Sequence, residues 1–491
     1  MSAQMLRAAT DLGSNYDLVI IGAGPAGLAA AIEAAAAGVQ ALVLDEGTEP
    51  GGQMYRAVVR RPRGTLACLD ANYWEGVDLV HAFLASGAAY APRATVWSLG
   101  QARPGPGLEL GISLGGASCL VQARRVILAT GAHERPMPVP GWTLPGVMLA
   151  GAAQIALKTS ALVPEGKVVL AGCGPLLYLL AGELLSAGVQ ISAMLDTTDR
   201  GQWLKALGHL PEFLGSPYLA KGLRLILRVR ASVRWHGNVD ALEAHGDGRM
   251  RQVRYRVGGR WRELDADLLL LHQGVVPDIN LLGAAGCALR WNPRQRCFQP
   301  QLDPAGESTV PGLAVAGDAV TVGGAALAEV SGRLAALEAL VAMGALDAAR
   351  AAARRDPLVR ARGRLARGRP FLDTLYQPRA AFLVPGDDQT IVCRCEEVRA
   401  GQLRAAIALG VPGVNQLKAF LRCGMGPCQG RMCATTVTEM MAAGGRVAPQ
   451  EVGTFRLRVP VKPIPLAELA SLPATPEALI AVTGEPTPLE P

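Results

Sequence analysis

The sequence predicts an α/β protein in which two similar strand–helix–strand units precede a small helical domain. Two stretches, Tyr16–Asp45 and Lys167–Asp196, each contain an apolar strand, a glycine-rich turn, an apolar helix and a second strand. Five of the ten cysteines lie between Cys393 and Cys433. Hydrophobic residues make up 50% of the 491 residues and aromatic residues only 4%, which suits helices packed closely on sheets.

Charge and hydropathy exclude several classes of protein. The net charge of +7 is modest, and the arginine-rich stretch Arg350–Arg379 is expected to be a solvated helix and linker, so no nucleic-acid partner is expected. No apolar run has the length of a membrane span without an interruption, and the first fourteen residues lack the apolar core of a signal peptide. These features predict a cytoplasmic protein with reduced thiols.

The first unit has the complete pattern of a Rossmann-like dinucleotide-binding fold. Its glycines allow a tight turn, close approach to a pyrophosphate and close packing of helix on strand, and the helix N-terminus then faces the phosphates. Asp45, eighteen residues after Gly27, is placed to accept hydrogen bonds from a ribose, with Glu46 as the alternative if the strand ends one residue later. The predicted contacts in the turn are Gly22, Gly24, Pro25, Ala26 and Gly27.

The second unit is a weaker copy of the first. Gly172 and Gly174 are present, but Leu177 stands where the third glycine is expected, and a leucine there should push the helix away from the strand. Counted from the first glycine, Leu195 corresponds to Asp45, whereas Asp196 corresponds to Glu46. A second nucleotide-binding fold is therefore predicted. Its occupancy by NAD or ATP, through Gly172, Gly174 and Asp196, is left open.

The segment Glu49–Arg56 follows the first unit and contains two consecutive glycines. Here the chain resembles the two-dinucleotide-fold flavoprotein superfamily, which includes the disulfide reductases. The resemblance implies bound FAD, with Gly52, Gln53 and Arg56 close to it. Disulfide reductases of this superfamily carry a redox-active cysteine pair, and this chain has none at either expected place, so disulfide exchange is not expected.

Two later segments resemble the same superfamily. Arg125–Gly131 is expected to be a buried strand that follows a small β-meander and ends in a turn at Thr130 and Gly131, close to the flavin. Thr309–Ala319 ends in Gly317 and Asp318. The resemblance implies that Asp318 accepts a hydrogen bond from the ribityl chain and that the next helix begins facing the flavin.

The cysteine-rich stretch predicts a cluster site. One residue separates Cys393 from Cys395, thirty-two residues separate Cys395 from Cys428, and four separate Cys428 from Cys433. Two close thiolate pairs, brought together by helices and flanked by glycines, can hold an iron–sulfur cluster. Zinc is the first alternative, although its ligands usually have wider spacing than C-x-C, and a disulfide, which needs an oxidising compartment, is the second.

The same stretch resembles the bacterioferritin-associated-ferredoxin (BFD-like) type of 2Fe–2S domain. The family pattern implies the ligands Cys393, Cys395, Cys428 and Cys433. Cys423 is then a spare thiol at the end of an expected helix, Val414–Arg422. The competing set of Cys393, Cys395, Cys423 and Cys428 stays open.

The segment Ala132–Gln154 and the tail motif VKPIPLAELA resemble one branch of the superfamily. That branch holds the cyanide-forming glycine dehydrogenase, the opine oxidases, D-hydroxyproline dehydrogenase and heterotetrameric sarcosine oxidase. The resemblance implies an FAD- and 2Fe–2S-containing subunit of a heteromeric dehydrogenase. Its substrate would be a small amine, imino acid or opine, such as octopine, nopaline, D-hydroxyproline or glycine, whose C–N bond is oxidised.

The family's partners are an amino-acid-oxidase-like flavoprotein and, in some members, a small ferredoxin-like subunit. Peripheral association with the inner membrane through the electron acceptor stays open. No residue is identified as a catalytic base. His133 and Glu134 either contact the flavin or substrate or simply cap or pair within a loop. The alternative functions are a self-sufficient NAD(P)H-dependent reductase, which Leu177 disfavours, and a scaffold whose nucleotides are structural.

The domain order follows from these motifs. The expected segments are 14–160 and 281–343 for the two parts of the FAD-binding domain, 161–280 for the second nucleotide-binding domain, 344–388 for a linker, 389–446 for the 2Fe–2S domain and 447–491 for a tail.

Overall fold

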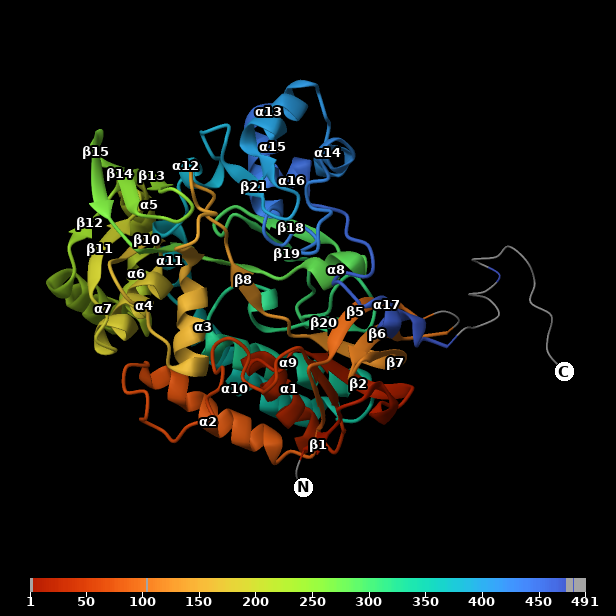
Figure 1. Cartoon of the computed structure of the whole chain (residues 1–491). Coiled ribbons are helices and arrows are strands. Elements are labelled where there is room, and N and C mark those ends of the chain that lie inside the picture. The colour runs from red at the N-terminus through yellow and green to blue at the C-terminus, as the bar shows by residue number, and fades with distance from the viewer. Residues whose placement is uncertain (1–2, 103–104, 474–479, 481–491) are drawn as a thin grey trace.

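The computed structural model describes residues 3–102, 105–473 and 480, and it has the predicted mixed α/β architecture. In Figure 1 the first sheet and its helices lie at the bottom, the second sheet at the upper left and the small helical domain at the top. Within the described residues no helix is both long enough and apolar enough to cross a bilayer.

An eight-stranded sheet forms the centre of the first unit, in the order β1-β4-β3-β2-β7-β6-β5, with β20 paired to β7. Its strands are β1 (Gln4–Met5), β2 (Asn15–Ile21), β3 (Leu42–Asp45), β4 (Ala89–Pro92), β5 (Thr95–Gln101), β6 (Leu108–Leu114), β7 (Ala117–Leu128) and β20 (Leu313–Val315). Strand β7 is antiparallel to β6 and parallel to β2, so the last strand of the predicted meander and the predicted buried strand are one strand.

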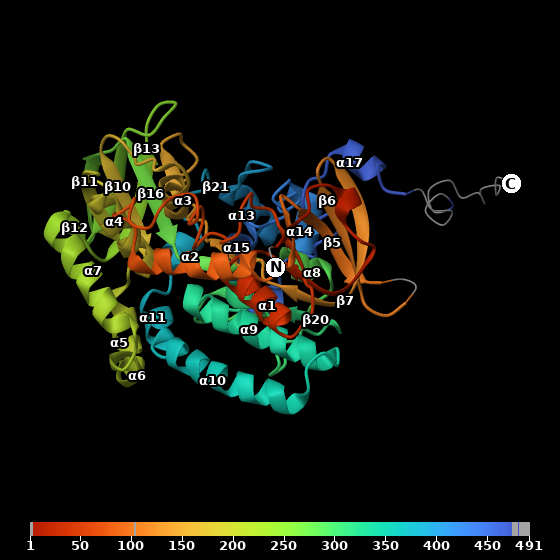
Figure 2. The same cartoon turned by 90° about the horizontal axis from the view of Figure 1, so that it is seen from below.

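Small residues let two helices pack closely beneath this sheet. A Cβ on Gly332 of α9 would lie 1.9 Å from the carbonyl oxygen of Ala26 in α1, so the two helices nearly touch. Figure 2 shows α10 outside α9, as a second layer. The helices of this part are α1 (Pro25–Ala36), α2 (Ala71–Leu84), α9 (Ala325–Ala342) and α10 (Ala348–Ala366), with the 3-10 turns Ala9–Asp11 and Gly317–Ala319.

The second unit has a five-stranded sheet in the order β12-β11-β10-β16-β9 and a separate three-stranded sheet, β13-β14-β15. Its strands are β9 (Val147–Leu149), β10 (Val168–Cys173), β11 (Ile191–Asp196), β12 (Trp235–His236), β13 (Val239–His245), β14 (Gln252–Val257), β15 (Arg260–Asp265) and β16 (Leu268–Gln273). Its helices are α3 (Ala150–Ser160), α4 (Pro175–Ser186), α5 (Arg200–Ala206), α6 (Leu210–Leu214) and α7 (Tyr218–Ser232), with the 3-10 turn Leu207–His209.

Two short antiparallel sheets, of two strands each, lie where the chain passes between the units. Strand β8 (Ala132–Glu134) pairs with β17 (Val275–Pro277), and β18 (Leu289–Asn292) pairs with β19 (Cys297–Pro300). Helix α8 (Asn280–Ala284) follows β17. These segments bring the chain back from the second unit to the first.

The stretch expected as a linker, residues 344–388, contains α10, α11 (Arg369–Leu375) and α12 (Ala380–Leu383). Helix α10 packs on α9, and α11 packs on α5 of the second unit. The stretch therefore crosses both units before the cysteine-rich domain begins.

The cysteine-rich domain is small and mostly helical, as expected. It contains β21 (Ile391–Cys393), β22 (Val398–Arg399), α13 (Ala400–Ala408), α14 (Val414–Leu421), α15 (Ala434–Gly445) and α16 (Pro449–Val452). The predicted helix Val414–Arg422 is observed as α14, which ends one residue earlier, at Leu421, and is capped by Arg422 in the left-handed conformation with φ +56°.

After α16 the tail returns to the first sheet. The backbone N–H of Val461 donates to the carbonyl of Trp97 at 2.9 Å, and α17 (Leu466–Ala470) packs beside β7. The part of the predicted tail at 474–479 and 481–491 lies outside the described residues.

Candidate functional site

The turn between β2 and α1 has no room for side chains. Gly22 has φ +106°, and a Cβ there would lie 2.4 Å from the carbonyl oxygen of Ala129. A Cβ on Gly27 would lie 1.8 Å from the carbonyl oxygen of Gly22. Helix α1 therefore begins directly above the strand end, with Pro25 at its first position, and its N-terminus is available to an anionic group.

Three other predicted turns converge on the start of α1. A Cβ on Gly52 would lie 2.8 Å from the Cα of Gly24. A Cβ on Gly317 would lie 2.8 Å from the Cβ of Ala26. The convergent turns are Gly51–Gly52, Thr130–Gly131 and Gly317–Asp318. Segments almost 300 residues apart in sequence thus surround one helix N-terminus.

The polar groups around this helix start fit a dinucleotide ligand. In the described part of the chain, Oγ1 of Thr130 is buried and has no hydrogen-bond partner, which a bound polar group would supply. Oδ1 of Asp318 accepts from the backbone N–H groups of Gly323 (2.9 Å) and Gly324 (3.3 Å), and burial raises the pKa of this carboxyl. Both of these bonds end on Oδ1, which leaves Oδ2 of Asp318 for a hydroxyl donor.

Of the two candidate ribose-binding acids, Asp45 is the one that faces the turn. Its Oδ2 accepts from the N–H of Ala23 at 2.5 Å, its Oδ1 accepts from the N–H of Gly47 at 2.6 Å, and burial raises its pKa. Glu46 instead is exposed and forms an ion pair with Lys462 of the tail. The strand end predicted from the sequence is therefore the one observed.

Lys158 is a buried residue of this region that the sequence analysis did not identify. Its side chain is 3% exposed, and Nζ donates to the carbonyls of Gln53 (3.3 Å) and Met54 (3.1 Å). Arg56 in the same loop donates from Nε to Oε1 of Gln53 at 3.1 Å. Burial lowers the pKa of Lys158 to about 8. The signal in the sequence is that Lys158 is the one charged residue of helix α3.

In the second unit, the alignment of Leu195 with Asp45 that was obtained by counting residues from the first glycine is wrong. The register places Ala171 opposite Leu195 and Gly172 opposite Asp196, whereas in the first unit Ile21 is opposite Leu44. A β-bulge at the start of β11 absorbs the additional residue. Asp196 therefore occupies the place in the second unit that Asp45 occupies in the first.

Asp196 is nevertheless engaged by its own chain. It is 4% exposed, its Oδ2 accepts from the hydroxyl of Tyr178 at 2.5 Å, and its Oδ1 accepts from the N–H of Thr198 at 2.8 Å. Leu177 is fully buried in the core between sheet and helices. The turn also differs from the first one, since Gly174 has φ +109° where Gly24 has φ −78°.

The segment after α11 lies against the same strand ends. The carbonyl of Tyr376 is 3.4 Å from Sγ of Cys173, at the end of β10, and Arg379 hydrogen-bonds the carbonyl of Thr198 at 3.3 Å. In parallel sheets, nucleotides bind outside the carboxyl ends of the strands. Residues 376–379 therefore cover the edge of the second sheet where a nucleotide would bind.

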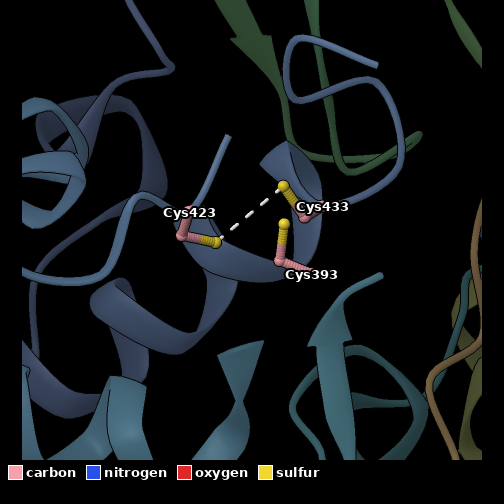
Figure 3. Close-up of side chains that lie close together, drawn as sticks. All are labelled: Cys393, Cys423 and Cys433. Atoms are coloured by element: carbon pink, nitrogen blue, oxygen red, sulfur yellow. Dashed lines mark hydrogen bonds between the residues drawn. The ribbon is translucent and has the colours of Figure 1, made fainter. Parts of the chain in front are cut away.

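Three buried cysteines meet inside the small helical domain. The sulfur atoms of Cys393, Cys423 and Cys433 all lie within 4.8 Å of one another, and those of Cys423 and Cys433 are 3.9 Å apart (Figure 3). The thiols of Cys423 and Cys433 lower the pKa of Cys393 by hydrogen bonding to it. A thiolate in a ring of soft sulfur donors suits iron.

The other two predicted ligands, Cys395 and Cys428, form a second pair nearby. Cys395 lies against the turn that precedes Cys428, because a Cβ on Gly426 would lie 2.3 Å from the Cβ of Cys395. Cys395 is exposed and Cys428 is partly buried. The structure thus groups Cys393 with both Cys423 and Cys433. The two predicted ligand sets share Cys393, Cys395 and Cys428 and differ in which of these two grouped thiols is the fourth ligand.

His133 and Glu134 both take part in specific contacts. Oε1 of Glu134 is 2.5 Å from Nδ1 of His272, and Oε2 accepts from the N–H of Gly151 at 2.8 Å, at the start of α3. His133 donates from Nε2 to the carbonyl of Arg431 at 3.0 Å, and burial lowers its pKa, which favours the neutral imidazole. Glu134 therefore links the first unit to the second, and His133 links it to the cysteine-rich domain.

The flavin-binding part and the cysteine-rich domain each match a known protein family. Residues 16–344 match the pyridine nucleotide-disulphide oxidoreductase family, and residues 391–443 match the BFD-like [2Fe-2S] binding domain. The opine oxidase A subunit of Rhizobium meliloti is 51% identical over 99% of this chain and 93% of its own length. Hydrogen cyanide synthase subunit HcnB of Pseudomonas aeruginosa is 32% identical over 93% of this chain and 99% of its own length.

A solved structure has the same fold over nearly the whole chain. The crystal structure of L-proline dehydrogenase from P. horikoshii superposes with a TM-score of 0.69 at 19% identity, over 96% of this chain and 80% of that one. At this identity the likeness concerns the fold alone.

Proposed function

The chain belongs to the family of the opine oxidase A subunit, and from this membership we propose that it is the FAD- and 2Fe–2S-containing subunit of a heteromeric dehydrogenase. The complex oxidises the C–N bond of a small amine, imino acid or opine and passes the electrons to an acceptor. The substrates proposed are octopine or nopaline, D-hydroxyproline, or glycine converted to cyanide.

One observation carries this proposal. A set of turns that fits FAD and a buried group of cysteines that fits a 2Fe–2S cluster lie on one chain, and that chain is 51% identical to the opine oxidase A subunit. FAD accepts electrons in pairs, whereas a 2Fe–2S cluster passes them singly, so a chain that holds both can divide a two-electron oxidation into single electrons.

Each residue has a defined task in this proposal. The N-terminus of α1, with Gly22, Gly24 and Gly27, holds the pyrophosphate, Asp45 holds the ribose and Asp318 holds the ribityl chain. Gly52, Gln53, Arg56, Thr130 and Gly131 line the flavin. Cys393, Cys395, Cys428 and Cys433 hold the cluster, and Cys423 is spare.

The substrate chemistry is proposed to occur in a partner. The first unit contains no recognisable catalytic base in the described turns around α1, and Asp318 is bonded to the backbone. The partner is an amino-acid-oxidase-like flavoprotein, and a small ferredoxin-like protein is a further member. The complex is proposed to be cytoplasmic.

The alternative is a self-sufficient reductase that takes hydride from NAD(P)H at the second unit. The hydrogen bonds of Asp196 to Tyr178 and Thr198, and the cover formed by residues 376–379, disfavour this alternative. Tyr178 gives Asp196 a side-chain hydroxyl donor, whereas the described donors to Asp45 are backbone N–H groups, and residues 376–379 cover the strand ends.

The test is dye reduction with and without the partner. The chain is purified alone and with the co-expressed flavoprotein, and each preparation receives octopine, nopaline, D-hydroxyproline, sarcosine or glycine with an artificial electron acceptor. We expect reduction with one of these substrates only when both chains are present. Reduction by this polypeptide alone would place the chemistry in it, and full activity without the cluster would favour the scaffold hypothesis.

A further inference from the structure

We propose that electrons pass from the flavin to the cluster through one contact, in which His133 and Asn280 hold the loop Gln429–Arg431. This inference rests on the proposed function, since it names the route between the two cofactors of that function. Each transfer moves one electron from the reduced flavin to one ferric iron of the cluster, which becomes ferrous. A one-electron acceptor reoxidises the cluster before the second transfer, and the flavin protons leave to solvent.

On the flavin side, the contact is continuous with the flavin-binding turn. His133 comes two residues after Gly131, within β8. Strand β17 pairs with β8, and the N–H of Asp278, just after β17, donates to the carbonyl of Gly131 at 3.0 Å. Asn280 then begins α8 and is only 5% exposed. The residues that touch the cluster loop are thus fixed to the turn beside the flavin.

On the cluster side, the contacted loop lies between two cluster cysteines. Residues 429–431 stand between Cys428 and Cys433. Nε2 of His133 donates to the carbonyl of Arg431 at 3.0 Å, and Nδ2 of Asn280 donates to the carbonyl of Gln429 at 3.0 Å. A chain of covalent and hydrogen bonds therefore runs from the flavin turn to both cysteines, without a gap across solvent.

An ion pair holds this contact in place beside a small cavity. Nε of Arg431 is 3.4 Å from Oδ2 of Asp278. A cavity of about 30 Å³ lies at the contact, lined among others by His133, Asn280 and Thr435. Nδ1 of His133 and Oγ1 of Thr435 are buried without partners in the described part of the chain, so each has a hydrogen-bonding position open to a water molecule.

Other bonds between the domains are less suited to be the route. Nε1 of Trp142 donates to the carbonyl of Ile391 at 2.7 Å, but Trp142 belongs to the core of the second unit. Arg296 pairs with the buried Glu439, which lies on α15 beyond the last cysteine. Both contacts fix the position of the domain, and neither begins at the flavin turn.

The test follows electron transfer inside the full chain loaded with FAD and cluster, without substrate or partner. Light in the presence of EDTA reduces the bound flavin, and the bleaching of the cluster and its low-temperature EPR signal report the arrival of electrons. The variants are His133→Phe and Asn280→Leu, singly and together. Trp142→Phe is the matched control, because it removes one bond between the domains and leaves the loop 429–431 untouched.

We expect the double variant to keep its iron, its FAD and both midpoint potentials, and to reduce the cluster about tenfold more slowly, which corresponds to about 1.4 kcal/mol in activation free energy. His133→Gln, whose amide can donate to the carbonyl of Arg431, should restore most of the rate lost in His133→Phe. An unchanged rate in the double variant, or an equal loss in Trp142→Phe, would overturn the route.

Failure of the route and failure of the proposed function give different results. The light-driven measurement does not depend on the substrate or on the partner, so a complex inactive with every amine leaves its result intact. If the wild-type cluster is not reduced after the flavin has been reduced, the route is overturned. The dye assay with amine substrates tests the proposed dehydrogenase function separately.

Discussion

The hydroxyl of Tyr178 donates a hydrogen bond of 2.5 Å to Oδ2 of Asp196, the acid that occupies in the second unit the place of Asp45 in the first. The indole Nε1 of Trp235 donates in turn to the Tyr178 oxygen at 3.1 Å. Asp196 thus belongs to a buried side-chain network, whereas Asp45 accepts only from backbone N–H groups. A ribose that displaced the Tyr178 hydroxyl from Asp196 would leave a buried group unpaired, at a cost of about 1–3 kcal/mol.

The first prediction concerns NADH and NADPH. Because Asp196 is engaged and residues 376–379 cover the strand ends, neither nucleotide alone should bleach the flavin under anaerobic conditions. The measurement is the flavin absorbance after each addition, with dithionite as the positive control. Rapid bleaching by NADH would show that the second unit opens, and would favour the self-sufficient reductase.

The second prediction concerns retention of FAD. Asp318→Ala removes the acceptor for Gly323, Gly324 and the ribityl chain, and should weaken FAD binding by about 1–3 kcal/mol, or about 5- to 150-fold in dissociation constant. Asp318→Asn keeps an oxygen acceptor and should lose less. The measurement is the amount of FAD that acid precipitation releases per mole of protein.

Asp265→Asn, on the exposed edge strand β15, is the matched control for this series and should retain the cofactor fully. Release of FMN in place of FAD from the wild type would contradict the assignment of the whole site. Equal retention in Asp318→Ala and the wild type would contradict the role of Asp318 alone.

The third prediction concerns the cluster ligands. With Cys393, Cys395, Cys428 and Cys433 as ligands, Cys433→Ser should lose most of the iron and visible absorbance, because a hard serine oxygen replaces thiolate poorly on iron. Cys423→Ser should keep both, although its sulfur lies 3.9 Å from that of Cys433. Cys119→Ser, in β7, is the control.

The opposite pattern, with iron lost in Cys423→Ser and kept in Cys433→Ser, would replace the ligand set but keep the cluster. Zinc in the wild type, with metal content unchanged in both variants, would refute electron transfer through this domain.

The fourth prediction is a pH dependence of stability that comes from Lys158. Its pKa is lowered from 10.5 to about 8 in the folded protein, so the unfolded chain binds more protons between these values. Burial of the charged form destabilises the fold below about pH 8, and this cost of about 3 kcal/mol is relieved as the pH rises toward 10.5.

The wild type should therefore gain thermal stability relative to Lys158→Met between about pH 7.5 and about pH 9.5. The measurement is the difference in Tm between the two proteins at each pH. Lys167→Met, which removes an exposed lysine paired with Asp265, is the control for the loss of a lysine outside the flavin-binding region. A difference in Tm for Lys158→Met that does not change with pH would mean that Lys158 titrates normally.

The parts of the site that the sequence predicted are local. Gly22, Gly27 and Asp45 follow one another within a single strand–helix–strand unit, and their spacing is fixed by the geometry of that unit. Helix α14 was predicted within one residue for the same reason. Such features depend on backbone conformation and on neighbours in sequence, both of which a spacing pattern records.

The register of the second unit was not predictable from spacing, because one bulged residue in β11 shifts every later position by one. Spacing also could not show that Asp196 is bonded to Tyr178, or that residues 376–379 cover the edge beside it. Whether a carboxylate is free for a ligand depends on its partners in three dimensions.

By itself, the sequence determined that this chain has a Rossmann-like site for FAD, a second weaker copy and a cysteine-rich domain. Only the tertiary structure decided that Lys158 is buried against the carbonyl of Met54, that His133 contacts Arg431 and that Cys423 lies beside Cys433. The first two contacts join residues about a hundred or more positions apart, and Cys423 reaches Cys433 by the turn after α14. They form because packing brings these segments together, which no periodicity or spacing within one segment encodes.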